Sequence, residues 1–207
     1  DAATEQIISG DADLSLNGGI TVSNGTLSST EGTLSASSFS IGAAGTVNIL
    51  GGTLSLPAGG TAVSGAAFTT SDSTISLEGT LEVADSWTIT NTSISLTGEA
   101  SLSHSSTVPL SLASLQTNGH DFELASAASD LTIENAFALS VGETLSTQGA
   151  DLIFEGSVTT SSISTIDAGD GGMLEFQNGG TASGTINAEN ATFKIGSAYA
   201  VTGILKT

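Results

Sequence analysis

Short segments in which apolar and small polar side chains alternate recur along the whole chain, as in Thr53-Leu-Ser-Leu and Ser93-Ile-Ser-Leu. Successive side chains of a strand point to opposite faces, so this alternation predicts strands that bury one face only. Successive segments lie 19 to 22 residues apart, except for one gap of 37 that leaves room for one more. Their first apolar residues are Leu14, Leu34, Leu54, Ile75, Ile94, Leu131, Leu152, Leu174 and Phe193.

A repeated phrase gives the period directly. Gly-Thr-Leu-Ser starts at Gly25, Gly32 and Gly52, and its variant Gly-Thr-Val-Asn starts at Gly45, so a shift of twenty residues relates one pair of phrases to the next. A constant period of this length, built from strand-sized pieces, predicts a solenoid whose coils each carry two or three strands. Each strand then pairs in parallel with its equivalent in the next coil, and the stacked coils bury a continuous apolar column.

The predicted fold class is therefore all-β, a single-stranded parallel β-helix of about ten coils of ~20 residues. We expect one domain over residues 1–207, least regular around 104–128, where Leu112 or Leu115 marks the coil missing from the regular series. We also expect Leu27 and Leu34 to point inward from two strands of one coil, with Glu31 facing water at the corner between them.

Two other β architectures compete with this prediction. A β-sandwich or barrel also has many short strands, but its strands have no reason to repeat side-chain identity at a constant offset. A left-handed β-helix favours six-residue sub-repeats and coils of about eighteen residues. Gaps of 19 to 22 residues favour the right-handed form.

Several phrases resemble those of a family of bacterial surface proteins. Residues 178–187 (NGGTASGTIN) resemble the repeat phrase of autotransporter passenger domains, residues 59–65 (GGTAVSG) echo it, and residues 51–56 (GGTLSL) resemble the short strand repeats of the same proteins. The resemblance implies a right-handed β-helix that is displayed outside a Gram-negative bacterium. It also implies a role in adhesion or autoaggregation.

Charge and composition exclude some partners. The chain has 21 acidic residues and only two cationic ones, Lys194 and Lys206, for a formal net charge of −19. Nucleic acids and anionic lipid surfaces are bound through cationic side chains, so we expect neither partner. No apolar run approaches the ~20 residues of a membrane helix, and we expect no membrane insertion. A chain rich in Gly, Ser and Thr and poor in lysine is typical of exported proteins, and we expect an extracellular or cell-surface location.

The candidate chemistry does not favour an enzyme. A lyase acting on uronic acids needs a cation to stabilise developing charge, and the two lysines lie within the last fourteen residues. A glycosidase needs two carboxylates beside a bound sugar, but Trp87 and Tyr199 are the only Trp and Tyr that could form a platform. We expect Trp87 to be partly buried on a coil, and His104 and His120 to lie in loops. A carbohydrate-active solenoid, either a glycoside hydrolase or a glycan-binding module, stays the first alternative.

Two pairs of acids are candidate calcium ligands, and no residue is assigned to catalysis or to another cofactor. Alignment of the strand phrases places Glu134 and Glu155 at equivalent corners on adjacent coils, about 5 Å apart, where a hard cation could bridge them. Asp167 and Asp170 lie in a glycine-rich turn similar to calcium-loaded turns. Three asparagines match the N-glycosylation pattern: Asn24, Asn91 and Asn190.

These observations predict a structural or adhesive solenoid whose partners are other copies of itself or other cell-surface molecules. Neither terminal segment shows a capping helix or polar coil, so we expect either a slice of a longer passenger or head-to-tail pairing into filaments. A second alternative is ice binding by regular threonines. Thr33, Thr53 and Thr74 stack in the predicted register, although Asp13 and Ser93 interrupt the row.

Overall fold

The computed structural model describes residues 6–8, 10–84, 86–126 and 130–207. These residues form strands joined by turns and include no helix, so none of them forms a helix that could cross a membrane. The prediction of an all-β solenoid of parallel coils is confirmed. The chain divides into two compact units, residues 1–106 and 107–207, which are described separately below.

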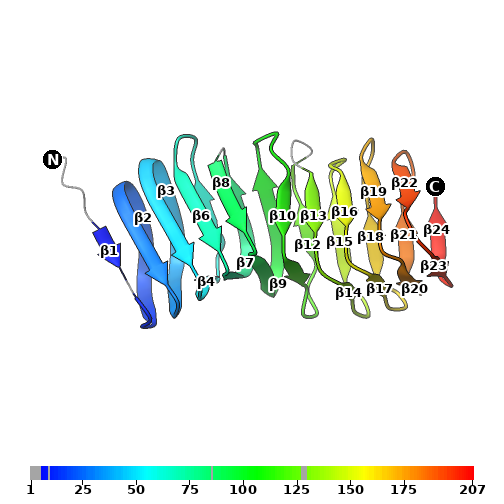
Figure 1. Cartoon of the computed structure of the whole chain (residues 1–207), viewed down its shortest axis with the longest axis horizontal. Helices are drawn as coiled ribbons and strands as arrows, with labels where there is room; N and C mark the ends of the chain where they lie inside the picture. The colour runs from blue at the N-terminus through cyan, green and yellow to red at the C-terminus, as the bar shows by residue number, and fades with distance from the viewer. Residues whose placement is uncertain (1–5, 9, 85, 127–129) are drawn as a thin grey trace. The chain divides into compact units, whose positions relative to one another are not determined.

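Every strand pairing within the first unit is parallel and joins one coil to the next (Figure 1). The long strands run through corners and so contribute to more than one side of the coil. Strand β3 pairs with β4, β5 and β6, and β7 pairs with β4, β5 and β9. The strands are β1 (Gln6–Ile8), β2 (Leu14–Thr30), β3 (Thr33–Leu50), β4 (Thr53–Leu56), β5 (Gly60–Ala62), β6 (Ala67–Ser71), β7 (Thr74–Val83), β8 (Ser86–Thr90) and β9 (Ser93–His104).

The register of these strands matches the period found in the sequence. One inward column runs Leu14, Leu34, Leu54, Ile75 and Ile94, and its last four members are completely buried. A second inward column, on another side of the coil, runs Leu27, Val47, Phe68 and Trp87. The predicted inward orientation of Leu27 and Leu34 is confirmed. An apolar side chain in either column contacts its equivalents above and below, which is how stacked coils bury what one coil alone would expose.

The second unit is built from three parallel stacks of short strands, one on each side of the coil (Figure 1). The first stack is β10 (Leu110–Leu112), β13 (Leu131–Ile133), β16 (Leu152–Phe154), β19 (Met173–Phe176) and β22 (Thr192–Ile195). The second is β14 (Phe137–Leu139), β17 (Val158–Thr160), β20 (Gly180–Ala182) and β23 (Tyr199–Val201). The third contains β12 (Phe122–Leu124), β15 (Thr144–Thr147), β18 (Thr165–Asp167), β21 (Thr185–Asn187) and β24 (Ile204–Lys206), and β11 (Ser114–Gln116) lies before β12 in the chain.

Two expectations about the irregular region are wrong. The residue paired with Leu131 is Leu110, while Leu112 pairs with Ile133 one position further on. Both leucines point inward because they are two residues apart on one strand, so the period-two pattern alone could not choose between them. His104 does not lie in a loop: it ends β9, pairs with Val83 and is buried.

The corner that precedes the first inward column has a left-handed backbone on four successive coils of the first unit. The residues two positions before β3, β4, β7 and β9 are Glu31, Gly51, Asp72 and Asn91, with φ between 43° and 83°. Glu31 is exposed there, as predicted. The side chain of Asn91 donates a 2.7 Å hydrogen bond to Asp72 Oδ1, so successive corners are also joined to one another. Residues of these types tolerate the left-handed region best, with glutamate the exception.

The second unit has the same corner with a less suitable residue. Gly142 and Ile163 each lie two residues before a strand of the third stack, and both have positive φ, 85° and 58°. A β-branched residue in this region is a steric outlier, because its side chain crowds the backbone. The Ile163 side chain is also 76% exposed, so burial does not offset this cost.

Candidate functional site: a polar cleft on the second unit

A cleft of about 750 Å³ lies beside the third strand stack of the second unit, where the chain turns after β18 and β21. Its volume is within the range of ligand-binding pockets. Polar groups dominate its lining, which consists of Gln148, Asp167, Gly169, Asp170, Asn187, Glu189, Asn190 and Thr207.

The lining is organised by two equivalent turns on adjacent coils. Asp167 ends β18 and pairs with Asn187, which ends β21. The Gly169 N–H donates to Asp167 Oδ1 at 3.0 Å and thereby closes the first turn. The Asn190 side chain donates to Asp170 Oδ1 at 3.2 Å and links the second turn to the first. The cleft is therefore a product of coil stacking, with groups twenty residues apart brought side by side.

The chemistry of this cleft is that of oxygen ligands and negative charge. Asp167, Asp170 and Glu189 contribute carboxylates, and no lysine lines the cleft. Carboxylate and amide oxygens suit a hard cation or the hydroxyls of a polyol, and they disfavour an anion. Among the described residues, no three acidic or histidine side chains are placed to hold one metal ion.

The two candidate calcium pairs have different surroundings. Asp167 and Asp170 both line the cleft. Glu134 and Glu155 follow β13 and β16, whose register places them on adjacent coils as expected, and both are exposed. Ser111 Oγ donates a 2.6 Å hydrogen bond to Glu134 Oε1. Calcium binding at either pair stays a prediction.

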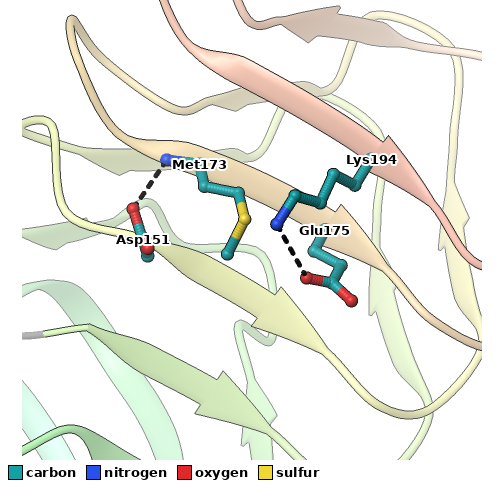
Figure 2. Close-up of polar contacts among 4 residues, drawn as sticks. All are labelled: Asp151, Met173, Glu175 and Lys194. Carbon is teal, nitrogen blue, oxygen red and sulfur yellow. Dashed lines mark hydrogen bonds and ion pairs between the residues drawn. The ribbon is translucent and has the colours of Figure 1, made fainter.

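Other carboxylates bind the backbone of the next coil, a role that the sequence interpretation missed. Figure 2 shows Asp151 accepting a 2.8 Å hydrogen bond from the N–H of Met173, which begins β19. Asp13 and Asp121, each directly before a strand, make the same contact to the first N–H of β3 and β15. An aspartate directly before a strand phrase was the available sequence signal.

Glu175 and Lys194 also join adjacent coils. Lys194 Nζ lies 3.9 Å from Glu175 Oε2 across the pair β19–β22 (Figure 2). The lysine side chain is 54% exposed, so this ion pair contributes at most about 1 kcal/mol.

Glu143 is a buried carboxylate that the sequence interpretation also missed. Its side chain is 2% exposed and accepts hydrogen bonds from the Thr117 hydroxyl, at 2.7 Å, and from the backbone N–H groups of Gly119 and Ser140. The equivalent position on the next coil is Ser164, a small residue. That contrast in size was the only signal in the sequence, and the structure assigns Glu143 the role of holding the turn at 117–119 against the next coil.

The three glycosylation candidates are all exposed. Asn24 lies within β2, whereas Asn91 and Asn190 lie at left-handed corners. The amide nitrogens of Asn91 and Asn190 already donate to Asp72 and Asp170. Attachment of a glycan would change those contacts, and modification at any of the three stays a prediction.

Neither candidate sugar platform is an open aromatic face. Trp87 is buried, stacks on Phe68 with ring centroids 5.3 Å apart, and donates from Nε1 to Thr70 Oγ1 at 2.9 Å. Tyr199 is half-buried and stacks on Phe176 at 4.7 Å. Burial raises the pKa of the Tyr199 hydroxyl to about 12, because the tyrosinate would lose its hydration.

Comparison with known proteins gives no assignment: no family model, no curated protein and no solved structure matches this chain. The solenoid fold therefore rests on the strand register described above. Membership among autotransporter passengers stays a prediction from the repeat phrases.

Proposed function

We propose that this chain is a non-catalytic structural or adhesive solenoid of the cell exterior, which acts through its outer surfaces and self-associates head to tail. The observation that carries the proposal is the chemistry of its outward columns. On the first side of the first unit they are small hydroxyl side chains repeated coil after coil: Thr33, Thr53, Thr74 and Ser93, and beside them Ser35, Ser55, Ser76 and Ser95. Asp13 takes the place equivalent to Thr33 on the coil before these columns, and the columns themselves carry no charge. Repeated hydroxyls of this kind suit extended contact with another surface.

In this proposal the contact between copies is made by the coil formed by β22, β23 and β24. Within the described residues these strands pair along one edge only, with β19, β20 and β21. Apolar side chains of the inward columns become exposed on this coil. Phe176 is completely buried, whereas its partner Ile195 is 46% exposed. Ile186 is completely buried, whereas its partner Leu205 is 41% exposed. Another coil that stacks on these strands, whether of the same chain or of a second copy, covers such side chains. A coil of a second copy has the matching hydrogen-bond spacing, and a contact of this type that does not close produces a filament.

Analytical sedimentation and electron microscopy of the purified chain test the self-association. The wild-type chain should form concentration-dependent oligomers. Leu205→Glu, which places a charge on the exposed apolar column, should remain monomeric. Thr181→Glu is the matched control, since Thr181 is exposed on β20 and faces outward. Monomeric wild-type chain at high concentration would refute the self-association.

Display on a non-adherent bacterium tests the adhesive role. Cells carrying the chain should settle faster, as aggregates, than cells carrying an unrelated solenoid of equal length. Equal settling rates, with display confirmed by antibody labelling, would contradict the proposal.

A further inference from the structure

A groove crosses the side of the first unit that is formed by β5 and by the second halves of β7 and β9. The outward column along it runs Thr61, Glu82 and Ser103, on adjacent coils about 4.8 Å apart. Two hollows, of about 420 Å³ and 320 Å³, lie on either flank of Thr61 and Glu82, and both of these residues line both hollows. Each volume is at the lower end of the range for ligand sites.

Backbone packing keeps the smaller hollow open. The segment Ala58, Gly59 and Gly60 forms part of its lining. A Cβ on Gly59 would overlap the Thr80 carbonyl, and one on Gly60 would lie 2.8 Å from Phe39 Cδ1. Side chains at these two positions are therefore excluded by the neighbouring coils, and the surface stays concave there.

The groove presents hydroxyls around one carboxylate. Thr61, Ser103 and Ser105 supply hydroxyls to the larger hollow, and Val63, 40% exposed, supplies an apolar patch. Ser38 and Thr80 line the other hollow. Within the part of the chain that the structure describes, the exposed Glu82 carboxylate has no hydrogen-bond or ion-pair partner in the protein. Residues 1–106 include no lysine or arginine that could neutralise it.

We propose that this groove binds a neutral oligosaccharide. A carboxylate accepts hydrogen bonds from two sugar hydroxyls, and these charge-assisted bonds are stronger than neutral ones. Ser105 Oγ already donates to the Ala84 carbonyl, and Thr80 Oγ1 shares a 2.8 Å hydrogen bond with Ser101 Oγ, so both retain lone pairs that can accept from a sugar. The hydroxyls of Thr61 and Ser103 can donate as well as accept, which matches sugar hydroxyls. Val63 packs against the C–H face of a pyranose ring. Acidic sugars are disfavoured, because the groove has a carboxylate and no cation.

Isothermal titration calorimetry of the purified chain with maltotetraose, cellotetraose and chitotetraose tests the proposal. At least one of these neutral oligosaccharides should bind saturably. Glu82→Gln, which keeps the shape and removes the charge, should weaken that binding by about tenfold or more. Glu78→Gln is the matched control: it removes an exposed carboxylate from the same strand outside both hollows, and it should leave the affinity unchanged.

Ser103→Tyr provides a second variant, because a bulky exposed side chain should fill the larger hollow and abolish binding without entering the core. Trp87 fluorescence checks that each variant is folded. The proposal is overturned if none of the three oligosaccharides binds, or if Glu82→Gln and Glu78→Gln change the affinity equally. Self-association through β22–β24 uses other residues, so loss of sugar binding leaves the sedimentation result intact.

Discussion

Replacement of Glu143 by alanine should destabilise the second unit strongly, because it leaves three hydrogen-bond donors without an acceptor. The Thr117 hydroxyl and the N–H groups of Gly119 and Ser140 all donate to this one carboxylate, which is 2% exposed. Thr117 is buried, and a buried donor left unpaired costs about 1–3 kcal/mol. Gly119 and Ser140 are exposed residues, so water can reach their N–H groups. Each of the two hydrogen bonds from these N–H groups contributes about 0.5–1.5 kcal/mol, and water entering the space of the lost side chain recovers part of the cost. We therefore expect a loss of about 2–4 kcal/mol in the free energy of unfolding.

Urea unfolding of wild type and variants measures this loss. Tyr199 absorbance reports on the second unit and Trp87 fluorescence on the first, since the chain has one residue of each type. Glu143→Gln should cost less than Glu143→Ala, because one amide oxygen still accepts. Glu155→Ala, which removes an exposed carboxylate in the same unit, is the control and should stay within about 0.5 kcal/mol of wild type. A Glu143→Ala variant within that same margin would show that the hydrogen bonds to Glu143 do not hold the turn.

Three further changes have defined expectations. Ile163→Gly should raise the free energy of unfolding by about 1 kcal/mol, because it relieves the strain of a β-branched residue in the left-handed region. Val141→Gly is the control: it changes an exposed residue without positive φ and should not stabilise the chain. An unchanged melting temperature for Ile163→Gly would contradict the proposed strain. The tyrosinate absorbance of Tyr199 should appear near pH 12 and not near pH 10. The Tyr199 hydroxyl loses its proton at lower pH in the unfolded chain than in the folded chain. This group's contribution to the free energy of unfolding should therefore be constant below pH 10 and fall between about pH 10 and 12. A tyrosinate absorbance midpoint near pH 10 would contradict the burial of Tyr199. Asp151→Ala should lower the free energy of unfolding by about 1–2 kcal/mol, because the N–H of Met173 loses its acceptor. Asp151→Asn should lower it less, since the amide oxygen can still accept. Equal losses for the two variants would contradict a stabilising role of this hydrogen bond.

Much of the architecture follows from the alternation and its period. A single coil cannot bury its own apolar face, so equivalent apolar positions of successive coils stack on one another. Repeated residues such as Leu34 and Leu54 therefore pair in register. The expected positions of Leu27 and Glu31 follow from the same reasoning, because corners need a left-handed residue and strands need an inward one. The stacking of Glu134 and Glu155 was predictable for the same reason.

Features that depend on the exact phase or on burial were not predictable. Leu110 and Leu112 fit the alternation equally well, and only the pairing with Leu131 separates them. His104 occupies an inward position that hydrophobicity patterns reserve for apolar residues. Glu143 resembles any surface acid in the sequence, because its three donors come from turns more than twenty residues away and from its own turn.

By itself the sequence determined a parallel β-solenoid and the columns of its core, since these follow from local alternation and a constant period. It also determined that residues 1–106 present no lysine or arginine, which follows from residue identity alone. The tertiary structure alone decided where the surface is concave. The cleft between Asp167 and Asn190 and the groove around Glu82 each combine groups from adjacent coils, about twenty residues apart. Their shapes depend on side-chain volumes and corner geometry that no single repeat contains.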